Sequence, residues 1–450
     1  MNNRDLVERD LACVWHPCTQ MKDLESTPPI PFRRGDGVYL EDYDGNRYID
    51  AVSSWWVNLF GHANPRINAA IADQLEHVEH VMMAGFTHEP VIRLSEKLVE
   101  VTPPPLTRCF YADNGSSGIE AALKMSFHCW RNAGAGEKTK FIALSNSYHG
   151  ETLGALAVGD VDLFKKTYRP LLMDSIIVNG PDCFHREDGD SWEAHSRRMF
   201  AHMEAALAEH AHEVCAVIVE PLIQCAGQMR MYHPVYLELL REACDRHGVH
   251  LIADEIATGF GRTGTMFACD QAGIAPDFLC LSKGLTGGYL PMCAVVTTES
   301  VYQAFYDEFE TLRAFLHSHS YTGNPLACRA AIATLEIFEH DDTLNANRAL
   351  ARTLDEALHE AFDGHPHVGD IRRHGMVGAV EMCRHGDRGQ PFPWQERRGL
   401  RVYRHGLTRG CLLRPLGNTM YFMPPYVIRP DEIRHLVTVA REGVDRATAD

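Results

Sequence analysis

The middle of the chain alternates short, mostly apolar blocks with longer amphipathic segments. Residues 109–111, 140–144, 214–219, 250–253, 278–281 and 293–297 are predominantly hydrophobic and predict buried strands. Between them, residues 119–130, 198–210 and 234–247 have the spacing of amphipathic helices, as with Ile119, Leu123 and Phe127. Continuous apolar strands separated by helices predict an α/β fold. Its central sheet should be mainly parallel, with helices on both faces.

The two ends of the chain have a different pattern. Residues 35–50 alternate around an Asp-Gly-Asn turn and predict a β-hairpin, and a helix is expected after Pro65, with Ile67, Ile71, Leu75 and Val78 on one face. From about residue 326 the pattern becomes helical and then mixed. A chain of 450 residues should divide into more than one lobe. We expect a large domain of residues 60–335. Residues 1–59 and 336–450 should together form a smaller α+β lobe.

Composition excludes several classes of function. Hydrophobic residues make up 45% and charged residues 23% of the chain, as in ordinary soluble globular proteins, and no apolar stretch is long enough to span a membrane. The formal charge of -17 argues against nucleic acid as a partner. The first ten residues are too charged for a signal peptide, and the fourteen cysteines are scattered without a Cys-x-x-Cys pair. These features are typical of reduced thiols and predict a cytoplasmic protein. The paired histidines and cysteines have no second pair of ligands at the spacing of a zinc site, so no metal is expected.

One lysine stands apart from the rest. The chain has eight lysines against thirty-five arginines, and Lys283 is the only lysine after residue 166. It follows the predicted strand 278–281 and precedes a glycine-rich segment. Burial at such a position lowers the pKa of an amine, and a neutral amine can bond covalently to an aldehyde. The alternative is an ordinary solvated lysine in an arginine-rich chain.

Three further features lie at the ends of predicted strands. Residues 113–118 form a Gly-Ser-Ser turn before a helix, which suits phosphate binding; the alternative is N-capping by Ser116 or Ser117. Tyr148 lies beside a glycine and could stack on a flat ring, although a turn tyrosine often only packs. Asp254 ends an apolar strand and needs a cationic partner, either a protonated ring nitrogen or an arginine.

Together these features match the site that pyridoxal phosphate (PLP) requires. Ligands of parallel sheets bind beyond the carboxyl ends of the strands, where all four features are expected. A competing interpretation is a dinucleotide site, because residues 259–264 fit Gly-x-Gly-x-x-Gly and Asp277 lies eighteen residues beyond Gly259. Two observations oppose it. Asp254 and Glu255 would repel a pyrophosphate, and no convincing helix begins after the glycines.

The motifs at residues 253–264 and 281–288 resemble the class III aminotransferases of PLP fold type I. The resemblance implies that the glycine loop is part of the family fold and that PLP is the cofactor. Residues 15–17, 53–56, 229–234 and 413–418 are similar to one branch of the family. That branch converts 8-amino-7-oxononanoate to 7,8-diaminononanoate in biotin biosynthesis. Adenosylmethionine is the expected amino donor, and lysine is the alternative. An alternative is another class III enzyme that uses an ω-amino acid or a diamine.

The resemblance also implies roles for individual residues. Lys283 would bind the cofactor covalently and move a proton between substrate and cofactor, and Asp254 would pair with the ring nitrogen. Ser116 and Ser117 would bind the phosphate, while Tyr148 would lie over the cofactor near the substrate. Trp55 and Trp56 would line the substrate pocket, and Arg414 would bind the carboxylate of the keto acid.

The chain departs from the family pattern at two places. Cys18 follows Trp-His-Pro where the family has a tyrosine that recognises substrate. Residues 317–320 read His-Ser-His-Ser where the family has His-Gly-Pro-Thr. In the family this loop crosses a homodimer interface into the partner's site. The resemblance therefore implies a homodimer in which Ser318 is near substrate, Ser320 supplies a hydroxyl to the phosphate, and His319 adds a backbone N–H.

Overall fold

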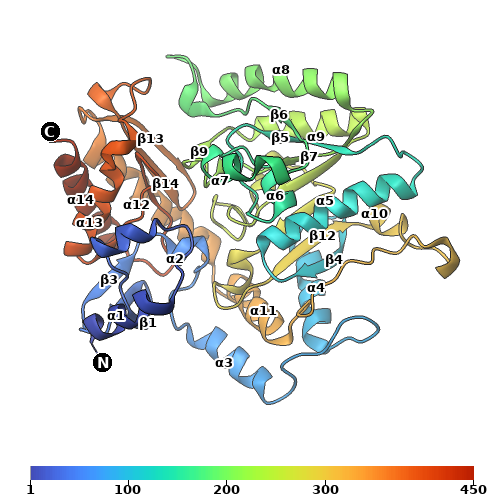
Figure 1. The fold of residues 1–450 in the computed structure, drawn as a ribbon, viewed down its shortest axis with the longest axis horizontal. Coiled ribbons are helices and arrows are strands. Elements are labelled where there is room, and N and C mark those ends of the chain that lie inside the picture. Colours follow the sequence, from blue (N-terminus) through green and yellow to red (C-terminus); the bar gives the residue numbers. More distant parts are fainter. Residues whose placement is uncertain (1, 450) are drawn as a thin grey trace.

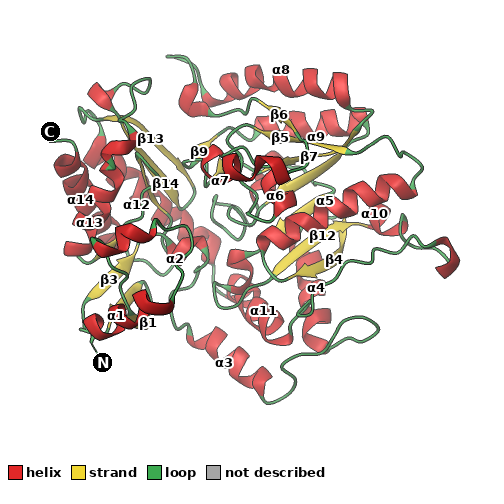
Figure 2. Cartoon of the chain, viewed as in Figure 1, coloured by secondary structure: helices red, strands yellow, loops and turns green. Residues whose placement is uncertain are grey.

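A seven-stranded sheet forms the centre of the computed structural model, which describes residues 2–449. Figures 1 and 2 show its place in the fold. Its strand order is β4-β12-β11-β10-β7-β5-β6. The bounds are β4 (Leu106–Ala112), β5 (Lys140–Leu144), β6 (Ile176–Val178), β7 (Val214–Val219), β10 (His250–Asp254), β11 (Phe278–Leu281) and β12 (Cys293–Thr298). Only β12 runs antiparallel to both of its neighbours, so the sheet is mainly parallel.

Helices cover both faces of this sheet. Side chains alternate along each strand: Ile218 packs in one cluster with Ile119 and Leu123, whereas Val217 packs in the other with Leu240. Ile119 and Leu123 lie on α5 and Leu240 lies on α9, so the two faces are covered by different helices. The helices of this region are α3 (Pro65–Leu75), α4 (Glu89–Val101), α5 (Gly115–Asn132), α6 (Leu153–Ala157), α7 (Asp162–Lys165), α8 (Trp192–His210), α9 (Val235–His247), α10 (Glu299–Gln303) and α11 (Pro325–His340). A two-stranded hairpin of β8 (Ile223–Gln224) and β9 (Arg230–Met231) lies outside the main sheet.

The N-terminal and C-terminal segments share a second sheet. Strands β1 (Phe32–Asp36), β2 (Tyr39–Asp42) and β3 (Arg47–Asp50) continue into β15 (Cys411–Leu412), which pairs with β3 in parallel. Figure 1 shows these N-terminal strands, in blue, beside the C-terminal helices, in red. The remaining elements are α1 (Asn3–Cys13), α2 (Ser53–Trp56), α12 (Thr343–Phe362), α13 (Arg398–Thr408), α14 (Pro430–Ala447) and a three-stranded sheet of β13 (Val368–His374), β14 (Val377–Met382) and β16 (Thr419–Phe422).

The predicted fold class is confirmed, as are most central elements. The strands at residues 140–144, 214–219 and 278–281 have the predicted bounds, and the N-terminal hairpin is formed by β2 and β3. The helix after Pro65 is shorter than predicted because it ends at Leu75, so Val78 lies beyond it. Pattern analysis did not find α1, α4 or β6. Within residues 2–449, no helix has the length and apolar character needed to cross a membrane.

Candidate active site

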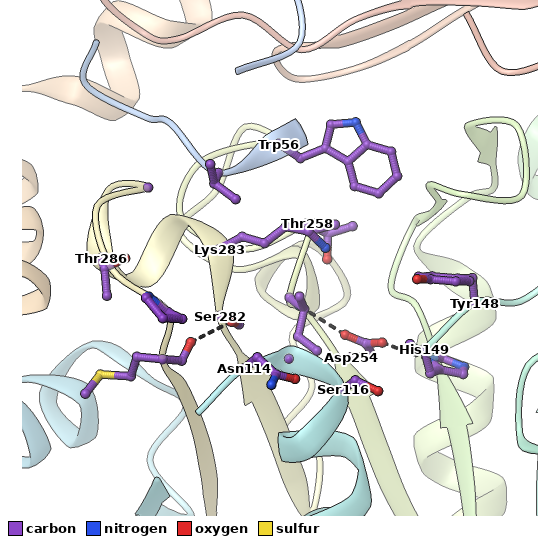
Figure 3. A pocket seen from close by; sticks show the side chains of 18 of the residues that line it. Trp56, Asn114, Ser116, Tyr148, His149, Asp254, Thr258, Ser282, Lys283 and Thr286 are labelled. Carbon is purple, nitrogen blue, oxygen red and sulfur yellow. Dashed lines mark hydrogen bonds and ion pairs between the residues drawn. The ribbon is translucent and has the colours of Figure 1, made fainter. Parts of the chain in front are cut away.

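A cavity of about 560 Å³ lies beyond the carboxyl ends of β4, β5, β7, β10 and β11. It is lined by Trp56, Ser116, Tyr148, Asp254 and Lys283, among others. These side chains come from loops far apart in the sequence and surround one space (Figure 3). The parallel strands bring them together because each loop leaves the same edge of the sheet.

Lys283 begins a 3-10 turn, Lys283–Thr286, directly after β11. Its backbone φ is +43°, an uncommon value for a residue other than glycine and one often found at functional sites. Burial lowers the pKa of its ammonium group, with Asp254 opposing that effect. The Nζ atom lies 5.1 Å from the centre of the Trp56 ring. Lys283 therefore has the setting of an amine that can lose its proton and react.

Asp254 is held at the end of β10 by two hydrogen bonds. His149 donates to its Oδ2 atom over 2.7 Å, and the backbone N–H of Ile256 donates to Oδ1 over 3.1 Å. The only ion pair of Asp254 within residues 2–449 is with His149, so the structure does not support an arginine partner. Because both contacts hold the carboxylate against the cavity, it can accept a hydrogen bond from a cationic group there (Figure 3).

The start of α5 forms an anion cradle. Asn114 caps the helix by accepting the N–H of Ser117 over 3.0 Å, so neither Ser116 nor Ser117 is the cap. The Ser116 hydroxyl lies in the cavity lining and accepts the N–H of Thr152 over 3.0 Å. A Cβ atom on Gly150 would fall 2.3 Å from Ser116 Oγ, so this loop requires glycine. Backbone amides and the helix dipole favour an anion at this end. Ser117 does not line the cavity.

Tyr148 is fixed at both its backbone and its ring. Its N–H donates to Glu220 over 2.9 Å, and its hydroxyl donates to Glu151 over 3.1 Å. Burial, reinforced by Glu151, raises the pKa of the phenol. The ring therefore stays neutral and lines the cavity as a flat surface.

The two tryptophans occupy different places. Trp56 is buried, lines the cavity and donates from its indole N–H to the Tyr421 hydroxyl over 3.0 Å. Trp55 is 40% exposed and lies outside the cavity lining, with the Arg414 guanidinium 4.7 Å from its ring centre.

Cys18 links the pair of Trp55 and Arg414 to the cavity lining. Its thiol donates to Glu151 over 3.7 Å. Burial and Glu151 raise the pKa of the Cys18 thiol, while the charge of Arg414 opposes them. Of these residues only Glu151 lines the cavity. We call Cys18, Trp55, Glu151 and Arg414 the outer group below.

The loop at residues 317–320 lies near the cradle but not in the cavity. His319 pairs with Asp113 over 3.2 Å and contacts His317 over 3.0 Å. Ser318 and Ser320 are exposed, and none of the three residues 318–320 lines the cavity of its own chain. A single chain therefore brings together Lys283, Asp254, Ser116, Tyr148 and Trp56, but not this loop.

Sequence analysis assigned no role to His149, Glu151 and Glu220, which line the cavity. Glu220 could have been found, because it follows the apolar strand β7 in the same way that Asp254 ends β10. Burial raises the pKa of Glu220 to about 7, with His149 opposing and Asp254 adding to the shift. His149 and Glu151 flank Tyr148 and Gly150, but no pattern in the sequence showed that they face the cavity.

The glycine segment at residues 259–264 is not a nucleotide site. Turns rather than a helix follow β10. The Arg262 side chain is buried and donates to the carbonyls of Pro424 and Asn58, both over 2.8 Å. This loop therefore joins three parts of the chain and leaves no helix N-terminus for a pyrophosphate.

The site and fold are those of a known enzyme family. The class III aminotransferase family model matches residues 21–442, and the chain belongs to this family. Adenosylmethionine-8-amino-7-oxononanoate aminotransferase of Helicobacter pylori is 46% identical over 446 residues, which cover 98% of each protein. The crystal structure of the enzyme with that name from Methanocaldococcus jannaschii has a TM-score of 0.93 at 37% identity, covering 99% of this chain and 100% of that one. An omega transaminase from Pseudomonas jessenii in complex with PMP also has a TM-score of 0.93, at 29% identity, covering 99% and 98%.

Proposed function

We propose that this protein is a PLP-dependent aminotransferase that converts 8-amino-7-oxononanoate to 7,8-diaminononanoate in biotin biosynthesis, with adenosylmethionine as the amino donor. One observation carries the proposal: Lys283 and Asp254 face the same cavity in a chain similar over its full length to enzymes of that name. The omega transaminase has an equal TM-score but lower sequence identity. The biotin-pathway reaction is therefore favoured over an ω-amino acid or diamine reaction.

The residues of the cavity fit PLP. A buried amine suits an aldehyde, a held carboxylate suits a protonated ring nitrogen, and the α5 cradle suits a phosphate. The glycine required at position 150 leaves the space beside Ser116 open. Bound PLP supplies an aldehyde that receives the amino group and a ring that withdraws electrons from the substrate carbon.

The protein's own groups then have separate tasks. Lys283 accepts and returns a proton at Nζ, which requires the lowered pKa that burial produces. Asp254, oriented by His149, would pair with the ring nitrogen and keep it protonated. Tyr148 would offer its ring as a flat surface against the cofactor, and Ser116 with the first amides of α5 would bind the phosphate.

The outer group suits the two substrates. Arg414 offers a guanidinium for the carboxylate at the end of the apolar keto acid, and Trp55 offers the adjoining aromatic wall. Adenosylmethionine carries a positive sulfonium, which is attracted to aromatic faces and to the Glu151 carboxylate. Cys18 adds a small side chain to this group and donates to Glu151.

A homodimer and a cytoplasmic location complete the proposal. Four large apolar side chains on the segment before residue 317 are exposed: Tyr306 (72%), Phe309 (85%), Leu312 (75%) and Leu316 (92%). Such exposure on a single chain marks an association surface, and it adjoins Ser318, His319 and Ser320. In the dimer these three residues would reach the partner's cofactor and substrate. All fourteen cysteines lie among the described residues and are free, in keeping with a reducing compartment.

A single-turnover donor screen tests the proposal. Purified enzyme loaded with PLP is mixed with adenosylmethionine, lysine, an ω-amino acid or a diamine, and the cofactor spectrum is followed. We expect adenosylmethionine to convert the cofactor to its amine form fastest, and 8-amino-7-oxononanoate to convert it back. Conversion only by ω-amino acids or diamines would refute the substrate assignment. Absence of a visible chromophore would refute PLP.

A further inference from the structure

The segment that carries both tryptophans has an unusual backbone. Ser53, Ser54, Trp55 and Trp56 have φ values of 50°, 47°, 74° and 74°. Hydrogen bonds from Trp56 N to Val52 O (2.8 Å) and from Val57 N to Ser53 O (3.0 Å) close it as a left-handed helical turn. Side chains disfavour this conformation because Cβ approaches the following carbonyl oxygen, and outside glycine it occurs as single residues. Contacts from outside the turn must therefore hold it.

Asp50 makes hydrogen bonds to the turn and to the residue before it. One carboxylate oxygen accepts the N–H of Val52 over 3.2 Å, and the other accepts the Ser54 hydroxyl over 2.7 Å and His62 Nε2 over 3.0 Å. The Asp50 side chain is completely buried. Burial alone would raise its pKa, but the hydrogen bonds from His62 and Ser54 outweigh burial and keep the pKa low. Asp50 is therefore an ionised acceptor at the entrance to the turn.

The turn also packs directly against the loop of Lys283. A Cβ atom on Gly288 would lie 2.9 Å from the backbone of Asn58, which follows the turn. On the other side, the Ser53 hydroxyl donates to the carbonyl of Met423 over 2.7 Å. A change in the handedness of the turn would therefore move Trp56 relative to Lys283 and Trp55 relative to Arg414.

We propose that Asp50 is a positioning residue for the reaction, because its carboxylate holds the left-handed turn that places Trp56 beside Lys283 and Trp55 beneath Arg414. Within residues 2–449, Asp50 hydrogen-bonds the turn but neither of these indoles, and it does not line the cavity, so it acts through the turn. The inference rests on the proposed function, which assigns Trp55 and Arg414 to the binding of the keto acid.

The test compares holoenzymes of the wild type, Asp50→Asn, Asp50→Asn/Ser54→Gly and Asp50→Asn/Ser54→Ala. Asparagine keeps the shape of Asp50 but loses its charge. We expect Asp50→Asn to raise KM for the keto acid about tenfold, while kcat falls less than about threefold. Glycine at position 54 should restore KM to within about threefold of the wild type, because glycine adopts positive φ freely. Alanine at position 54 should give no recovery.

Two results would overturn the proposal. One is an unchanged KM in Asp50→Asn; the other is equal recovery with alanine and glycine, which a purely structural role would produce. If Asp50→Asn does not fold, Ser54→Ala alone serves, since Ser54 is exposed and this change removes only its hydroxyl. It should raise KM for the keto acid about threefold, and no change would count against the proposal.

A second readout needs no substrate. Bound PLP quenches the emission of nearby tryptophan, and Trp56 lines the cofactor cavity. We expect less quenching in Asp50→Asn and recovery in Asp50→Asn/Ser54→Gly. If the keto acid assignment is wrong, the wild type will not aminate 8-amino-7-oxononanoate, but this quenching pattern will persist. If the role of Asp50 is wrong, the wild type will be active and the pattern will be absent.

Discussion

Replacing Glu220 with glutamine should remove a pH-dependent loss of stability from the ligand-free protein. Glu220 is 5% exposed and accepts backbone N–H groups from Tyr148 over 2.9 Å and Cys225 over 3.0 Å. These bonds favour the ionised form, but burial and the neighbouring Asp254 raise its pKa from 4.5 to about 7. Such a difference corresponds to about 3 kcal/mol between the folded and unfolded states.

The sign of the effect follows from protonation in the two states. Below pH 4.5 Glu220 is protonated in both states and contributes nothing to pH dependence. Between pH 4.5 and about 7 the unfolded chain releases the proton while the folded protein keeps it, so stability falls as pH rises. Above pH 7 the full cost of about 3 kcal/mol is present. Glutamine cannot ionise, so the variant lacks this loss.

Thermal unfolding between pH 5 and pH 8.5 measures the effect. The midpoint of the wild type minus that of Glu220→Gln should fall by about 3 °C over this range if the chain unfolds as one cooperative unit. Glu137→Gln, a substitution of the same kind at an exposed position, is the matched control and should show no such trend. A constant offset between wild type and Glu220→Gln at every pH would refute the argument.

Three further substitutions test the site. Lys283→Ala should still bind PLP but lose the covalent link and turnover, seen as a changed cofactor spectrum; near-normal turnover would overturn its assignment. Arg414→Ala should raise KM for the keto acid at least about tenfold and KM for the donor much less, because only the keto acid presents a carboxylate at the far end of an apolar chain. Equal changes in the two KM values would contradict the clamp. Gly150→Ala should weaken PLP binding about tenfold or more in an equilibrium titration, because its Cβ would lie 2.3 Å from Ser116 Oγ at a backbone φ of +128°. Unchanged affinity would show that this loop does not shape the phosphate cradle.

The central sheet was predictable because buried parallel strands are continuous apolar blocks. The apolar blocks at residues 214–219 and before Lys283 predicted strands, and both are buried strands in the structure. Polar residues at the carboxyl ends of such strands must meet at one edge of the sheet. Lys283, Asp254, Ser116 and Tyr148 therefore converged as expected, although their sequence positions span more than a third of the chain.

The sequence by itself determined the alternation of strands and helices, and it determined which chemical groups meet at the edge of the sheet. Tertiary structure decided what depends on contacts between distant segments. Strand β15 has two residues and pairs with β3, from the opposite end of the chain, so no local pattern could show it. The left-handed turn at Ser53–Trp56 contains no glycine, so the sequence does not predict it. It forms because Asp50 and Met423 hold it through hydrogen bonds. The burial of Trp56 but not of Trp55 likewise depends on tertiary packing, and so does the hydrogen bond between His149 and Asp254.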